Sequence, residues 1–263
     1  MYAGSDDGSS AKECCMAQGA YVSSTWCTNS DRGASGTRTF EEPGTELLAV
    51  GHTHFCGSDR STRVWCAGFG VDREELTLPS AVDALVAVGG ATCALLDTGE
   101  LHCWGFHPVL TGRLFGAEST VPTQVPGVDA AVAVGLGRSF LCLLHSDGSV
   151  SCTTGCWSPP GHGSGFTTVS GVSGAQELAV GAEHACVQTA DDVVCWGANW
   201  QAEPAECAGP ASVRVAADAL EVRGSHTCAR EGQRMECWGR NWHQQLGGPS
   251  ERPDLGRVSF TLP

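Results

Sequence analysis

The chain has 263 residues, a net charge of −14 and 41% hydrophobic residues, which is enough apolar material for a folded core. Its acidic surface repels phosphate backbones, and no run approaches the roughly 20 apolar residues of a transmembrane helix, so neither nucleic acid nor a membrane span is expected. The 15 cysteines indicate an oxidising compartment, extracellular, periplasmic or at the cell surface, although the first residues, MYAGSDDGSSAKECC, contain no export signal.

Residues 1–43 predict a partial or degenerate repeat behind a flexible N-terminal tether. The first ten residues are rich in serine, glycine and aspartate, which is typical of a flexible segment. TRTF (37–40) predicts one short strand, but no apolar strand precedes it. Cys15 and Cys27 nevertheless occupy the positions of a cysteine pair that recurs in every later unit.

Residues 81–127 show clearly the pattern that the later part of the chain repeats. The apolar run 85–88 predicts a buried strand that ends at a glycine pair. Segments 93–96 and 100–105 predict a hairpin, because an Asp-Thr-Gly turn joins them. TQVPG (123–127) adds a fourth short strand. Each unit therefore comprises four strands in about 40 residues, a length typical of one propeller blade.

Five consecutive units keep this pattern, with predicted boundaries at 44–80, 81–127, 128–173, 174–217 and 218–263. A single four-stranded sheet cannot bury both of its faces, but radially stacked sheets bury each face against a neighbour. A linear β-solenoid is the alternative, although its rungs are shorter and contain no such hairpins. We therefore predict an all-β fold, a single-domain β-propeller of six blades, or of seven if its start is missing.

The last two units resemble the repeat of the regulator of chromosome condensation family. That repeat combines Gly-x-x-His, an Asp-Gly turn, Trp-Gly-x-Asn and Gly-Gln-Leu-Gly. The matching residues are His226, Trp238, Gly239, Asn241, Gln245, Leu246 and Gly247, and one unit earlier His184, Trp196, Gly197 and Asn199. Weaker copies cover 44–173, but 152–165 lacks Trp-Gly-x-Asn. The resemblance implies a propeller, typically of seven blades, as in the compact bacterial propeller β-lactamase inhibitory protein II.

Each hairpin has one cysteine on each arm. The predicted disulfides are Cys56/Cys66, Cys93/Cys103, Cys142/Cys152, Cys186/Cys195 and Cys228/Cys237, with Cys15/Cys27 in the partial unit. Opposed residues of antiparallel strands have Cα atoms about 4.5–5.5 Å apart, within the range that a disulfide spans. Buried free thiols and a metal site are the alternatives, although zinc prefers clustered Cys-x₂₋₄-Cys pairs. Cys14, Cys156 and Cys207 have no assigned partner.

Two sets of residues are candidates for function. His52 and His54 form a His-x-His pair that suits zinc, but His54, His184 and His226 occupy equivalent positions of different units, which favours a structural role, so no metal or cofactor is expected. Aromatic residues follow the glycine of the return strand in four units, and we predict that they line one end of the disc as a binding face: Phe69, Phe106, Trp200 and Trp242. The alternative is that each packs beneath its own loop.

These features predict a non-enzymatic binding scaffold, secreted or at the cell surface and monomeric, which binds a protein or glycan partner through loops at one end of the propeller. A proteinaceous enzyme inhibitor resembling β-lactamase inhibitory protein II is the alternative. Guanine-nucleotide exchange, the activity of the family's namesake, is less favoured because of the acidic charge and the paired cysteines. A glycoside-active propeller is also less favoured, because no Asp-box pattern is present.

Overall fold

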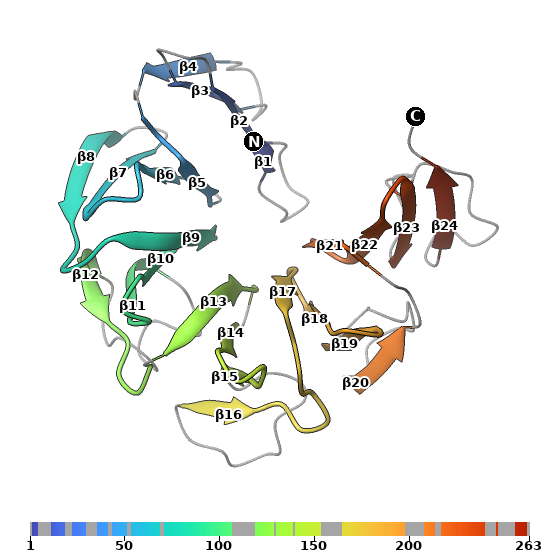
Figure 1. Cartoon of the computed structure of the whole chain (residues 1–263). Helices are drawn as coiled ribbons and strands as arrows, with labels where there is room; N and C mark the ends of the chain where they lie inside the picture. Colours follow the sequence, from blue (N-terminus) through green and yellow to red (C-terminus); the bar gives the residue numbers. More distant parts are fainter. Residues whose placement is uncertain are drawn as a thin grey trace. The chain divides into compact units, whose positions relative to one another are not determined.

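A computed structural model describes the backbone of residues 2–4, 12–18, 23–29, 36–41, 44–51, 54–68, 71–106, 119–128, 130–138, 140–153, 165–197, 208–213, 217–239, 246 and 256–261. The chain divides into two compact units, Met1–Ala131 and Val132–Pro263. Each unit contains three four-stranded antiparallel sheets, and the four strands of a sheet follow one another in sequence order (Figure 1). The predicted all-β fold is confirmed.

The first unit contains sheets 1 to 3. Sheet 1 comprises β1 (Tyr2–Gly4), β2 (Lys12–Gln18), β3 (Ser23–Asn29) and β4 (Gly36–Glu41). Sheet 2 comprises β5 (Leu47–Val50), β6 (His54–Ser58), β7 (Arg63–Gly68) and β8 (Val71–Thr77). Sheet 3 comprises β9 (Val82–Val88), β10 (Gly90–Leu96), β11 (Leu101–Phe106) and β12 (Ser119–Gln124). The short strand β1 occupies the place for which the sequence offers no apolar run.

The second unit contains sheets 4 to 6. Sheet 4 comprises β13 (Ala131–Leu136), β14 (Leu141–His145), β15 (Val150–Thr153) and β16 (Phe166–Thr168). Sheet 5 comprises β17 (Glu177–Val180), β18 (His184–Gln188), β19 (Val193–Gly197) and β20 (Ala208–Val213). Sheet 6 comprises β21 (Ala219–Arg223), β22 (His226–Glu231), β23 (Arg234–Gly239) and β24 (Gly256–Thr261). The predicted unit boundaries all fall between sheets.

Hydrophobic side chains of neighbouring sheets form shared cores within each unit. In the first unit, Val64 of sheet 2 belongs to one cluster with Leu85 and Leu96 of sheet 3. In the second, Leu144 of sheet 4 belongs to one cluster with Trp196 of sheet 5. Burying both faces of the inner strands explains why their sequences are almost continuously apolar instead of alternating. The stacking of sheets therefore supplies much of the core.

The hairpin turn of sheet 3 has the predicted geometry. Gly99 adopts a φ of +82°, and its N–H donates to the carbonyl oxygen of Leu96 at 2.9 Å. A residue with a Cβ adopts this left-handed conformation only with strain, which is why glycine stands at the turn. In the part of the chain that the structure describes, no helix has both the length and the apolar character needed to cross a lipid bilayer.

Candidate functional site

Disulfides bridge the two central strands in each of sheets 2 to 6. The confirmed pairs are Cys56–Cys66, Cys93–Cys103, Cys142–Cys152, Cys186–Cys195 and Cys228–Cys237. Each pair is directly opposed in the antiparallel register, and each has a Cα–Cα distance of 4.1 Å. These ten cysteines are therefore neither free thiols nor metal ligands.

The predicted Cys15–Cys27 disulfide falls in sheet 1, of which only the backbone is described. The register of β2 and β3 pairs Cys27 with Cys14, whereas Cys15 is opposite Trp26. Directly opposed residues are the ones that a cross-strand disulfide joins in the other sheets, so the register favours Cys14 as the partner of Cys27. The bond itself remains a prediction, and Cys156 and Cys207 lie outside the described residues.

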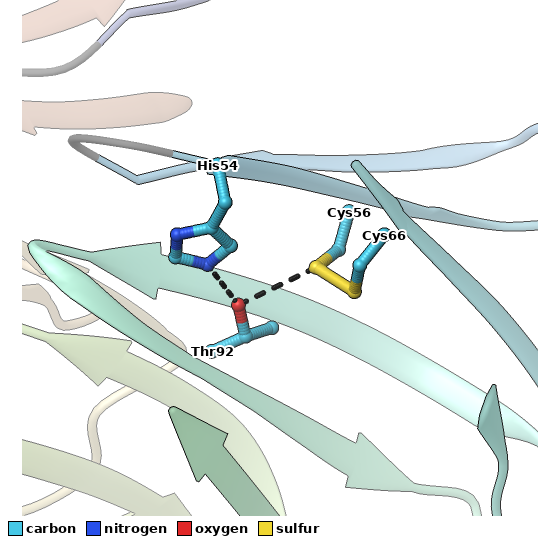
Figure 2. Close-up of a disulfide and its surroundings, with 4 residues drawn as sticks. All are labelled: His54, Cys56, Cys66 and Thr92. Atoms are coloured by element: carbon cyan, nitrogen blue, oxygen red, sulfur yellow. Dashed lines mark hydrogen bonds between the residues drawn. A yellow bond between two sulfur atoms is a disulfide. The ribbon is translucent and has the colours of Figure 1, made fainter. Parts of the chain in front are cut away.

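A histidine and a threonine connect neighbouring sheets beside a disulfide. In the first unit, Nε2 of His54 on β6 lies 2.6 Å from Oγ1 of Thr92 on β10. The same Oγ1 lies 3.5 Å from Sγ of Cys56 (Figure 2). The disulfide sulfur has no hydrogen, so in this contact the Thr92 hydroxyl is the donor. A hydroxyl has one hydrogen to donate, and His54 must then donate its own hydrogen from Nε2.

The second unit repeats this arrangement between sheets 5 and 6. Nε2 of His184 lies 2.8 Å from Oγ1 of Thr227, which lies 3.7 Å from Sγ of Cys186. Nδ1 of His184 is buried without a hydrogen-bond partner. If the proton is on Nε2, Nδ1 carries no hydrogen and no unpaired N–H is buried. The hydrogen-bond network therefore assigns to His184 the Nε2–H tautomer that it assigns to His54.

Glycine is required where the histidine ring lies over the preceding loop. A Cβ added at Gly51 would lie 2.5 Å from Cε1 of His54 and 2.7 Å from the carbonyl oxygen of Gly89 in sheet 3. At Gly181 it would lie 2.8 Å from the carbonyl oxygen of Gly224 in sheet 6. All three distances are too short for non-bonded atoms. The Gly-x-x-His motif therefore permits close approach of two sheets.

Burial holds both histidines neutral at physiological pH. Desolvation lowers the pKa of His54 to about 4, and desolvation together with the nearby His226 lowers the pKa of His184 to about 4. Thr92 and Thr227 are fully buried. An imidazole bonded to a buried hydroxyl acts here as a link between sheets, in agreement with the predicted structural role. His52 lies outside the described residues, within which no group of three metal-ligating side chains occurs.

Phe106 is the predicted binding residue that the structure describes. It is the last residue of β11, pairs with Gly90 of β10, and has an exposed fraction of 49%. About half of its surface is therefore exposed, and the loop that follows it lies outside the described residues. Phe69, Trp200 and Trp242 lie outside the described residues, so their gathering with Phe106 remains a prediction.

Four-stranded antiparallel sheets that stack through shared cores define the class of the protein as a β-propeller, and solved structures agree. Human WBSCR16 matches with 15% identity and a TM-score of 0.67, over 88% of this chain and 73% of that chain. The structure of Kap60 bound to yeast RCC1 (Prp20) matches with 17% identity and a TM-score of 0.61, over 74% and 56%. The ectodomain of the Physcomitrella patens receptor kinase CR4 matches with 21% identity and a TM-score of 0.53, over 79% and 56%.

These likenesses identify the fold as an RCC1-like β-propeller, which confirms the predicted architecture. No protein-family model and no curated protein matches the sequence. The chain spans 56% of the length of the yeast chain that it matches. At identities of this size, the likeness concerns the fold and leaves ligands and activity to be argued from this chain's own residues.

Proposed function

We propose that this protein is a non-enzymatic binding scaffold that works outside the cytoplasm and captures a protein partner through one end of its propeller. The observation that supports it best is the exposure of Phe106 at a strand end of a disulfide-bridged hairpin. Exposed aromatic side chains on rigid supports are typical hot spots of protein interfaces, because they bury a large area at a low cost in conformational entropy.

The recurring polar residues support a scaffold. His54 and His184 are bonded to buried threonines between sheets, and this use leaves them neutral and engaged in structure. Disulfides in five of the hairpins restrict the motion of strand ends from which loops project. A rigid support reduces the entropy that binding loops lose when they meet a partner.

The same bonds support the proposed location. Stable disulfides are typical of secreted, periplasmic and cell-surface proteins, because cytosolic thiol systems keep cysteines reduced. An RCC1-like propeller also occurs in an ectodomain, that of the Physcomitrella patens receptor kinase CR4. The yeast structure contains Kap60 bound to RCC1 (Prp20). This complex supports a binding role for the present chain.

The test compares two phenylalanines of the same protein. The exported, disulfide-bonded protein is immobilised and exposed to extracellular material from its source, with wild type, Phe106→Ala and Phe260→Ala in parallel. Phe260 is 38% exposed on β24 and serves as the matched control. Loss of a hot-spot aromatic weakens binding by about tenfold or more. Trp200→Ala and Trp242→Ala extend the test to the other predicted residues.

We expect wild type and Phe260→Ala to capture the same partner, and Phe106→Ala to lose it while keeping its β-sheet circular dichroism. Equal capture by Phe106→Ala and wild type would refute the proposed binding face. The non-enzymatic role would be refuted if the wild type converted a substrate and the Phe106→Ala variant converted it at the same rate.

A further inference from the structure

The five hairpin disulfides differ in their exposure and in what lies beside them. Both cysteines are fully buried in the pairs Cys93–Cys103, Cys142–Cys152 and Cys186–Cys195. In the pair Cys56–Cys66, Cys56 is fully buried, but Cys66 on β7 is partly exposed. Part of Cys66 therefore lies at the surface of sheet 2, whereas the three other pairs are fully buried.

We propose that Cys56–Cys66 is a site of thiol–disulfide exchange, at which an external thiol attacks Cys66 and the Thr92 hydroxyl stabilises Cys56 as the leaving group. Figure 2 shows the arrangement, in which Thr92 lies between His54 and the disulfide. The co-reactant is a small-molecule thiol or the cysteine of a thiol–disulfide oxidoreductase, both of which attack as the thiolate.

The exchange balances as one bond broken and one bond formed. The external thiolate sulfur bonds to Sγ of Cys66, and the Cys56–Cys66 bond breaks. Its electron pair leaves with Sγ of Cys56, which becomes a thiolate that accepts the hydrogen bond of the Thr92 hydroxyl, and the proton that the external thiol released on becoming a thiolate balances this charge. The products are a mixed disulfide at Cys66 and a free thiol at Cys56, and no net oxidation occurs. A second thiolate reverses or completes the reduction by attacking the mixed disulfide.

The Thr92 hydroxyl favours the departure of Cys56 from an otherwise apolar core cluster. Thr92 already directs its hydroxyl hydrogen to Sγ of Cys56 at 3.5 Å, and His54 supports that orientation by donating from Nε2. A hydrogen bond to a developing thiolate lowers the pKa of that thiol, and a thiol of lower pKa leaves faster. The hydroxyl is in position before the reaction, because the inter-sheet bond with His54 holds it there.

Two other hairpins each have only one of the two features that the exchange requires, which are an exposed cysteine and a hydroxyl donor beside a disulfide sulfur. Cys186–Cys195 has the same histidine and threonine beside Cys186, but both of its cysteines are fully buried. Cys228–Cys237 has a partly exposed Cys228, yet the described residues place no hydroxyl beside its sulfurs. Only Cys56–Cys66, among the bonds that the structure describes, combines exposure with a hydroxyl donor. This difference gives internal controls within one molecule.

The test treats the full, oxidised chain with reduced glutathione under native conditions and maps the products. Exchange is stopped with acid, free thiols are alkylated, and peptides are identified by mass spectrometry. We expect glutathione to appear first on Cys66 and the alkyl group first on Cys56, while the Cys186–Cys195 bond stays intact. Exchange at Cys228–Cys237 should be about tenfold slower than at Cys56–Cys66, because it lacks one hydrogen bond to the charged sulfur.

Variants of the two threonines isolate the hydroxyl. Thr92→Val slows exchange at Cys66 by about tenfold, because the hydrogen bond to the leaving sulfur is lost, and Thr92→Ser restores the rate. Thr227→Val removes the equivalent hydroxyl beside Cys186 and leaves the rate at Cys66 unchanged. Glutathione on Cys56, one common rate for all five disulfides, or equal rates for wild type and Thr92→Val would each overturn the proposal. If Thr92→Val does not fold, the two exchange rates of the wild type are compared instead. A rate at Cys56–Cys66 no greater than the rate at Cys228–Cys237 would overturn the proposal.

Discussion

Acidification from pH 7 to pH 4 should weaken the fold through His54 and His184. Both have a folded-state pKa of about 4 against an ordinary value of 6.5. Between these two values the unfolded chain binds protons that the folded chain excludes, so the free energy of unfolding decreases as the pH falls. The stability is fully present above pH 6.5, is lost progressively below it, and is exhausted once the pH passes below about 4.

The magnitude follows from the size of the shift. One pKa unit corresponds to about 1.4 kcal/mol, so each histidine accounts for about 3 kcal/mol of lost stability. Two such losses rival the total stability of an ordinary domain, about 5–15 kcal/mol. The exposed carboxylates Asp59, Asp147 and Asp218 have lowered pKa values because hydrogen bonds favour their charged forms, so they lose their contribution only at lower pH.

Urea unfolding at a series of pH values, followed by tryptophan fluorescence without reductant, measures this loss. The control is a double variant, His54→Gln with His184→Gln, because glutamine keeps an N–H donor for the threonine and does not titrate. We expect the wild type to lose much more stability than the double variant between pH 7 and pH 4. The reasoning is refuted if both proteins lose the same amount, or if the wild type gains stability on acidification.

Three further predictions concern stability and connectivity. Replacing Cys142 and Cys152 with alanine opens a short loop and should lower the free energy of unfolding by roughly 2–3 kcal/mol in urea titrations; an unchanged midpoint would contradict the role of this bridge. Gly181→Ala should cost about 1–3 kcal/mol because its Cβ meets backbone atoms of the neighbouring sheet, whereas Gly165→Ala, with open space around it, should cost much less. Peptide mapping should find Cys27 bonded to Cys14, as the register favours, and a Cys15–Cys27 peptide would contradict this expectation.

Spacing alone predicted the hairpin disulfides, and the reason is geometrical. Residues at equal distances from a hairpin turn face each other across antiparallel strands, so Cys93 and Cys103 meet wherever the hairpin forms. Phe106 was predicted to lie just after the return-strand glycine, in the loop that follows. Its placement at the end of β11 instead of in the following loop depends on pairing with Gly90, which the local sequence does not encode.

Two structural features could not be predicted from the sequence because they depend on neighbouring elements. Strand β1 has no apolar pattern and forms by pairing with β2. The bond between His184 and Thr227 joins residues 43 positions apart, and it requires that sheets 5 and 6 stack. A signal was present, since a threonine directly precedes the first hairpin cysteine in each sheet that follows a sheet with such a histidine. Where Phe140 replaces the histidine, Ala185 replaces the threonine.

Mass spectrometry of peptides from the exported protein, digested without reductant, tests most directly the claim that bridged hairpins build this scaffold outside the cytoplasm. The account predicts five intra-hairpin peptides, each joining two cysteines 9 or 10 residues apart. Free thiols at these ten cysteines, or bridges that join different sheets, would contradict it.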